Sequence, residues 1–189
     1  MLEKIANLLK TGTRSNIELA YQLSLSTKTS LWPLERGIKD LLYHAHTQPS
    51  IAFDNLPLGQ LCYLLNNVIA LSIKEQLLTH LPEQLYFCPA LVILEIIDTP
   101  LIALPQSIGE LAQLKSLTLK NTAIEQLPSS IAQLSKLETL SLINNPNLKH
   151  FPRALLQLPN LKTVRVDASI KTPTINDCPF EFIIIDSPI

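Results

Sequence analysis

The chain of 189 residues is long enough to bury a sizeable hydrophobic core in one compact unit, and it contains 14 prolines but only four glycines. Its net charge of −1 and isoelectric point near 6.4 give no electrostatic reason to expect nucleic acid or an anionic membrane as a partner. The sequence contains no glycine-rich phosphate loop.

Residues 1–50 are predicted to form an N-terminal helical cap. One helix is expected over about residues 2–10, a second begins after Ser15, which has the capping-box spacing to Glu18, and a third covers about residues 34–44. These helices would cover the first hydrophobic layer of the repeats that follow. The N-terminus lacks the continuous apolar core of a secretory signal, and no apolar run approaches membrane-spanning length.

Residues 51–173 carry an internal repeat. The units LPQSIGELAQLKSLTLKNTAIEQ and LPSSIAQLSKLETLSLINNPNLK place leucine and isoleucine at the same positions, and the frame extends outwards in both directions. Units start at Leu58, Leu81, Leu104, Leu127 and Phe151, so the spacings are 23, 23, 23 and 24 residues. A fixed period of this kind indicates a repeat architecture.

Each unit contains two kinds of apolar spacing. Leu117 and Leu119 lie two residues apart, which predicts one face of a short strand. Ile108, Leu111 and Leu114 recur every third residue, which suits a 3₁₀ or irregular turn. A polar side chain that can hydrogen-bond the turn backbone follows each strand, at Gln76, Thr99, Thr122, Asn145 and Ser169.

This pattern resembles the leucine-rich repeat family. The match is LxxLxLxx(N/T)x(L/I) after an LPxxI opening, as in Leu114 to Ile124, and threonines at positions 99 and 122 are similar to the plant-type variant. The resemblance covers about two-thirds of the chain. It implies an α/β fold: a leucine-rich repeat solenoid with a curved parallel β-sheet on the concave face and 3₁₀ or irregular turns on the convex face.

Residues 174–189 are predicted to supply a C-terminal capping strand. The run Phe180 to Ile185 is apolar and short, and it follows a break that contains two prolines. Asp186 and Pro188 would discourage further pairing at that edge.

The three cysteines are odd in number and fit no zinc spacing. Cys62 and Cys88 occupy repeat positions where other units have leucine or isoleucine, which predicts buried thiols and a reducing, cytoplasmic location. Cys178 is off the repeat frame and is interpreted as an inert thiol of the C-terminal cap. The sequence predicts no catalytic residue, no metal site and no cofactor.

The side chains that flank the strand leucines are expected to point onto the concave face. Exposed isoleucines in a polar frame suit contact with a protein, although lone surface isoleucines are also ordinary, and the N-terminal cap could fold over Ile93 and Ile97. The predicted partner-binding residues are Ser72, Lys74, Ile93, Glu95, Ile97, Thr118, Lys120, Ser141, Ile143, Arg165 and Asp167.

Two functional hypotheses follow. The first is a monomeric, non-enzymatic protein–protein interaction module that binds a partner protein, neither nucleic acid nor membrane, through the concave face. The LPxxI repeats resemble those of effectors that bacteria deliver into the cytoplasm of host cells, so the partner would be a host protein. The alternative is the substrate-recognition part of an E3 ubiquitin ligase-like enzyme, or a small enzyme of that kind. The segment NDCPF lacks the Cys-x-Asp pattern of those ligases.

Overall fold

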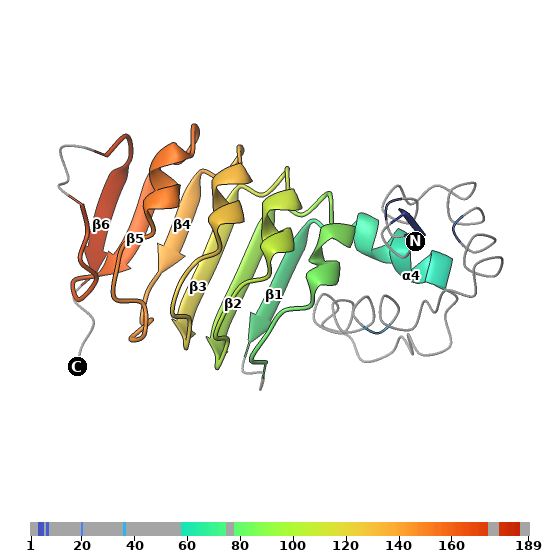
Figure 1. Ribbon diagram of the computed structural model, residues 1–189, viewed down its shortest axis with the longest axis horizontal. Coiled ribbons are helices and arrows are strands. Elements are labelled where there is room, and N and C mark those ends of the chain that lie inside the picture. Colours follow the sequence, from blue (N-terminus) through green and yellow to red (C-terminus); the bar gives the residue numbers. More distant parts are fainter. Residues whose placement is uncertain are drawn as a thin grey trace.

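The computed structural model describes residues 58–74, 78–173 and 178–185, with five isolated positions nearer the N-terminus. Its centre is one sheet of six parallel strands whose spatial order, β1 to β6, is also their order in the chain (Figure 1). The strands are β1 (Ala70–Lys74), β2 (Ile93–Thr99), β3 (Ser116–Thr122), β4 (Thr139–Leu142), β5 (Thr163–Asp167) and β6 (Glu181–Ile185).

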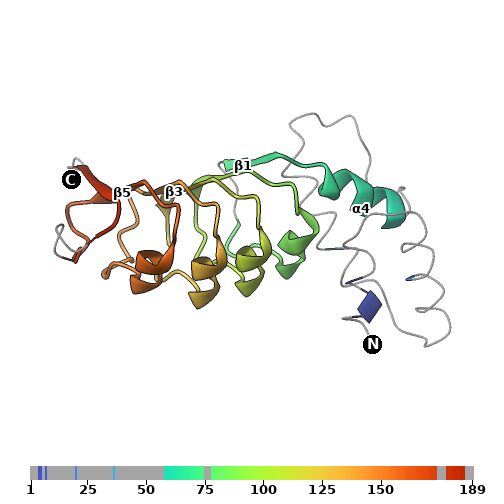
Figure 2. The same ribbon diagram turned by 90° about the horizontal axis from the view of Figure 1, so that it is seen from above.

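A short helical segment precedes each of the first five strands, and the segments before β2, β3, β4 and β5 lie on the side of the molecule opposite the sheet (Figure 2). Before β1 this segment is α4 (Leu58–Asn66), and the later ones are 3₁₀ helices: η2 (Glu83–Phe87), η3 (Gln106–Glu110), η4 (Ser129–Gln133) and η5 (Arg153–Gln157). A proline at φ between −66° and −70° stands at the N-cap of all four 3₁₀ helices. Proline suits this position because its φ is fixed and its missing N–H would have had no helical partner.

The first unit differs from the expected 3₁₀ or irregular turn. Buried Leu61, Cys62 and Leu65 in α4 follow the spacing of an α-helical apolar face rather than the every-third spacing of the later units. Leu58 is also the one repeat start that no proline follows. The expectation of a 3₁₀ turn was therefore wrong for this unit and right for the next four.

Two columns of apolar side chains form the core behind the sheet. The register aligns Leu94 with Leu117, Leu117 with Leu140 and Leu140 with Val164, and all four side chains are buried. The parallel sheet that the resemblance implied is thus confirmed, and its strands stack these side chains in one column. Such stacking lets each unit bury an apolar face that it could not bury alone.

The expected helical cap lies outside the described residues, apart from the five isolated positions. Of these, Ile5 and Ala20 are fully buried and belong to the same hydrophobic core as the repeats. β6 occupies the place expected for a last strand, while the division into segments 1–50, 51–173 and 174–189 stays a prediction. No helix within the described part of the chain is long and apolar enough to span a bilayer.

Candidate protein-binding face

The outward-pointing side chains of β1–β5 form one surface, called the sheet face below. Its middle is a row of residues, one per strand, that the register places side by side; we call it the central row. The central row consists of Ser72, Glu95, Thr118, Ser141 and Arg165. Neighbouring strands lie about 4.8 Å apart, so the row is a regular line held by backbone hydrogen bonds.

The charges of the central row lie towards opposite ends of it. The Glu95 carboxylate near one end accepts a hydrogen bond of 3.0 Å from the Ser72 hydroxyl, and Arg165 at the other end is exposed. Three strand spacings separate Glu95 from Arg165, which corresponds to roughly 14 Å. Hydroxyl groups fill the interval, at Thr118 and Ser141 in the row itself. The central row therefore has an acidic residue near one end, a basic residue at the other end and small polar residues between them.

A second row lies nearer the carboxyl ends of the strands. The register aligns Lys74 with Ile97 and Ile97 with Lys120, and both lysines are exposed. Ile143 does not continue this row as a strand residue, because β4 ends at Leu142. Its carbonyl accepts a hydrogen bond of 2.9 Å from the Asn121 N–H, which fixes the turn, and its side chain is half-buried.

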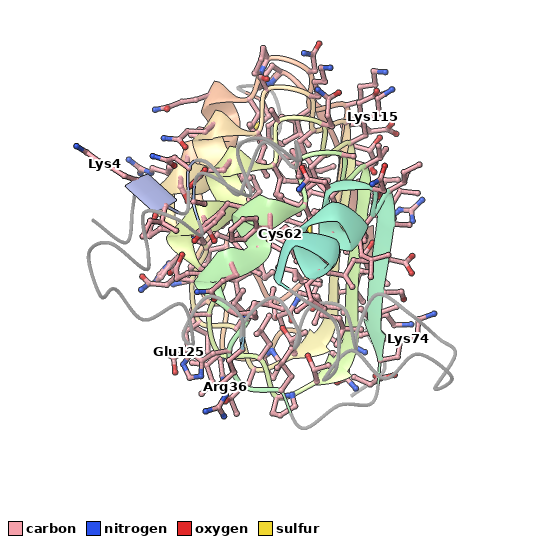
Figure 3. The ribbon with its side chains drawn as sticks, turned by 90° about the vertical axis from the view of Figure 1, so that its right-hand side faces the viewer. Lys4, Arg36, Cys62, Lys74, Lys115 and Glu125 are labelled. Carbon is pink, nitrogen blue, oxygen red and sulfur yellow. The ribbon has the colours of Figure 1, made fainter. Side chains whose placement is uncertain are left out.

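The amino-terminal ends of the strands complete the sheet face. Ile93 is 40% exposed beside Ala70 and Ser116, its register neighbours. Lys115 and Lys162 flank Glu138, and the hydrogen bond from Lys162 lowers the pKa of that carboxyl. Figure 3 looks along the sheet from its N-terminal end and shows Lys115 and Lys74 projecting from the same side of the molecule, towards opposite ends of the strands.

Asp167 corrects the predicted list. Its side chain is only 6% exposed, and its carboxylate accepts hydrogen bonds from the backbone N–H groups of Asn144, at 2.7 Å, and Asn145, at 3.4 Å. These two N–H groups follow the end of β4 at Leu142, so they lie outside the strand ladder. Asp167 thus holds the turn of the preceding unit and is not available as a partner-binding residue.

The polar ladder after the strands survives, but only in part. Asn145 is buried and donates through Nδ2 to the Leu119 carbonyl (2.9 Å), while its Oδ1 accepts from the Thr122 hydroxyl (2.6 Å) and N–H (3.2 Å). Thr99, one unit earlier, is buried too, yet its hydroxyl has no hydrogen-bond partner among the described residues. The ladder is therefore strong between β3 and β5 and interrupted at β2.

Sequence reasoning missed a set of residues just before this ladder. Asp98, Asn121 and Asn144 have positive φ values of 56°, 54° and 56°, and Asn121 Nδ2 donates to Asp98 Oδ1 at 2.6 Å. Aspartate and asparagine tolerate this left-handed conformation better than other side chains with a Cβ. Their recurrence every 23 residues was the signal that could have revealed them. They border the sheet face with exposed polar groups.

The described residues contain no arrangement that suggests catalysis. No group of three or more histidine, cysteine, aspartate or glutamate side chains within them could hold a metal ion. Burial raises the pKa of the Cys62 and Cys88 thiols to about 12, so both are inert at neutral pH. Cys178 is half-buried and packs against the hydrophobic core.

A parallel sheet on one side, a turn on the other and hydrogen bonds that recur at a separation of 23 residues define a repeat solenoid. The chain is a leucine-rich repeat protein: residues 104–177 match the family described as a leucine-rich repeat region. Domains of this kind generally act as protein-binding modules and are usually not catalytic. No curated protein has a sequence that matches this chain.

Solved structures that are similar to this chain come from several sources. Internalin C2 of Listeria monocytogenes is 17% identical with a TM-score of 0.52, over 80% of this chain and 63% of that one. A leucine-rich repeat protein of Leptospira interrogans is 33% identical (TM-score 0.43; 49% and 23% covered), and the leucine-rich repeat domain of the type III effector XopL is 20% identical (0.43; 78% and 61%). The chain thus spans less than a quarter of the Leptospira protein and under two-thirds of the other two.

Proposed function

We propose that this chain binds a partner protein through the sheet face, without catalysing a reaction. The central row is the observation that carries the proposal, because its side chains stand on a hydrogen-bonded sheet and lose little conformational freedom on binding. Exposed Ile93 and half-buried Ile97 add apolar surface within a polar frame, which suits the core of a protein interface.

The polarity of the central row gives the partner an orientation. A basic group of the partner would meet Glu95, and an acidic group roughly 14 Å away would meet Arg165. Surface charges of this kind contribute more to orientation and association rate than to affinity. The sheet face would therefore select a partner with the opposite charge order.

Affinity capture tests this proposal. Three baits are compared: the wild type, a sheet-face variant with Glu95→Arg and Arg165→Glu, and a control variant with Glu125→Arg and Arg153→Glu. The control reverses one acidic and one basic residue that are exposed and lie away from the sheet face (Figure 3 labels Glu125). Partners retained by the wild type and the control should be lost from the sheet-face variant, with unchanged melting temperatures. Equal capture by both variants would move the site off the sheet face.

We further propose that the chain acts as a bacterial effector in the cytoplasm of a host cell. The support is the likeness of its LPxxI units to those of delivered effectors, together with three free cysteines among the described residues, which suit a reducing compartment. Parallel captures from host and bacterial extracts test this: specific partners should come from the host extract alone. Partners found only in bacterial extract would contradict the effector role.

The packing of Cys178 against the core favours a structural role over a ligase activity. Incubation with activated ubiquitin-conjugating enzymes, followed by mass spectrometry, should find no ubiquitin thioester on this residue. A thioester that Cys178→Ser abolishes would instead make the chain an enzyme.

A further inference from the structure

The last strand leaves core positions uncovered. The register aligns Phe182 with Val164 and Ile184 with Val166, which places both side chains in the two columns that form the core of every earlier strand. Val166 is fully buried, whereas Ile184 is 48% exposed. Phe182 is partly covered by Phe151 and Phe180, with ring centroids 5.2 Å away in both cases. The hydrophobic layer of the solenoid therefore reaches solvent at Ile184.

The backbone of β6 is also open on this side. The Glu181 N–H donates to the Lys162 carbonyl at 2.8 Å, and the Ile185 carbonyl accepts from the Ala168 N–H at 3.3 Å, so these residues direct their backbone groups towards β5. Along a strand the direction alternates, and Phe182 and Ile184 therefore direct theirs away from β5. No strand of the described part pairs with that edge. An open apolar edge of this kind is a template for pairing with another strand.

We propose that the free edge of β6 binds β6 of a second copy of this chain, in an antiparallel pair around a twofold axis at Ile183. In this register Phe182 and Ile184 of one copy exchange hydrogen bonds with Ile184 and Phe182 of the other. With the axis perpendicular to the sheet, both core layers lie on the same side. Ile184 of each copy then packs against Phe182 of the other copy, and the two hydrophobic cores become continuous.

Charge and symmetry favour this occupant. Glu181 is the one charged residue of β6, and the symmetric register sets it opposite Ile185 of the second copy, so no like charges face each other. Head-to-tail docking onto the β1 edge gains less, because Leu71 and Ile73, in the same two columns, are already buried at 1% exposure. A closed twofold contact also leaves no open end from which a filament could grow. The proposal replaces two expectations from the sequence: a monomer, and an edge at which Asp186 and Pro188, which lie outside the described residues, discourage pairing.

Sedimentation equilibrium of the full chain tests the association. The wild type should show twice the mass of one chain, and Ile184→Lys should show the mass of a single chain. Ile184→Pro should do the same, because it removes only an outward N–H and leaves the bonds to β5 intact. Ile102→Lys is the matched control, since Ile102 is also exposed but lies away from the edge, and it should remain dimeric. A monomeric wild type, or a dimeric Ile184→Lys, would overturn the proposal.

Cross-linking tests the symmetry independently. Facing residues without mutual hydrogen bonds have Cα atoms about 4.5 Å apart in an antiparallel pair, which a disulfide can span. In a Cys178→Ser background, Ile183→Cys should therefore form a disulfide-linked dimer on mild oxidation. Glu181→Cys, roughly 14 Å from its mate, should not. Cross-linking of both variants to the same extent, or of neither, would exclude the twofold pair.

Discussion

The two ends of the six-stranded sheet carry the same kind of residues in the same register, and they differ in exposure. At the N-terminal end Leu71 and Ile73 are 1% exposed, whereas Ile184, which occupies the column of Ile73 at the far end, is 48% exposed. In a solenoid each unit contacts only its neighbours, so burial is decided by what stacks next to a residue rather than by its own apolarity. The C-terminal end therefore exposes an apolar column that the N-terminal end buries.

A second difference runs along the polar ladder. Asn145 satisfies three groups of the preceding unit, while Thr99 has no partner for its hydroxyl among the described residues. Thr122 faces Thr99 in the register, but its hydroxyl donates to Asn145. The ladder thus stabilises the C-terminal half of the array more than the N-terminal half.

The largest expected effect compares the middle of the core column with its open end. Leu117→Ala should lower the free energy of unfolding by about 2–5 kcal/mol, because it removes a fully buried side chain and leaves a cavity. Ile184→Ala should cost less than about 1 kcal/mol in the monomeric protein, because half of that side chain is already in water. Urea unfolding monitored by circular dichroism measures both. Equal losses would show that the end of the column is as well covered as its middle.

The next effect compares two positions of the ladder. Asn145→Ala leaves the Leu119 carbonyl and two donors of Thr122 without partners, so we expect a loss of about 2–4 kcal/mol. Thr99→Val removes a buried hydroxyl that bonds nothing in the described part of the chain, and stability should change by less than about 0.5 kcal/mol or rise slightly. A marked loss in Thr99→Val would reveal a hydrogen bond at β2.

Spacing in the sequence predicted the regular part of this structure. Leucines every second residue gave the strands, leucines every third residue gave the 3₁₀ turns, and the 23-residue period fixed which residues face each other. The central row followed from the same alternation. The spacing did not predict two features. β4 ends before Ile143, and the Asp167 carboxylate points into the fold and accepts a hydrogen bond from the Asn144 N–H. Those outcomes depend on contacts between units, which no local pattern contains.

A smaller effect tests how closely neighbouring turns pack in the middle of the array. A Cβ added at Gly109 would lie 2.6 Å from the carbonyl oxygen of Ser130 in the next unit, so η3 and η4 would have to move apart. Gly109→Ala should therefore cost about 1–3 kcal/mol, whereas Gln106→Ala in the same turn, at an exposed position, should be near neutral. Denaturant unfolding decides between them, and a neutral Gly109→Ala would show that the turns are not in contact there.

The smallest effect compares the two ends through thiol reactivity. Cys62 and Cys88 lie at the buried N-terminal end with pKa values raised to about 12 by burial, so at pH 9 only about 0.1% of either is thiolate in the folded protein. Cys178, at the C-terminal end, is half-buried. A thiol-specific reagent should therefore label Cys178 first under native conditions and reach the other two only when the chain opens. Since an unfolded thiol ionises near its ordinary pKa of 9.0, the stabilisation from keeping these thiols neutral is complete below that pH and falls between pH 9 and pH 12. Mass spectrometry of the labelled peptides at neutral pH orders the three sites, and early labelling of Cys62 would mean that the N-terminal end is the one that opens.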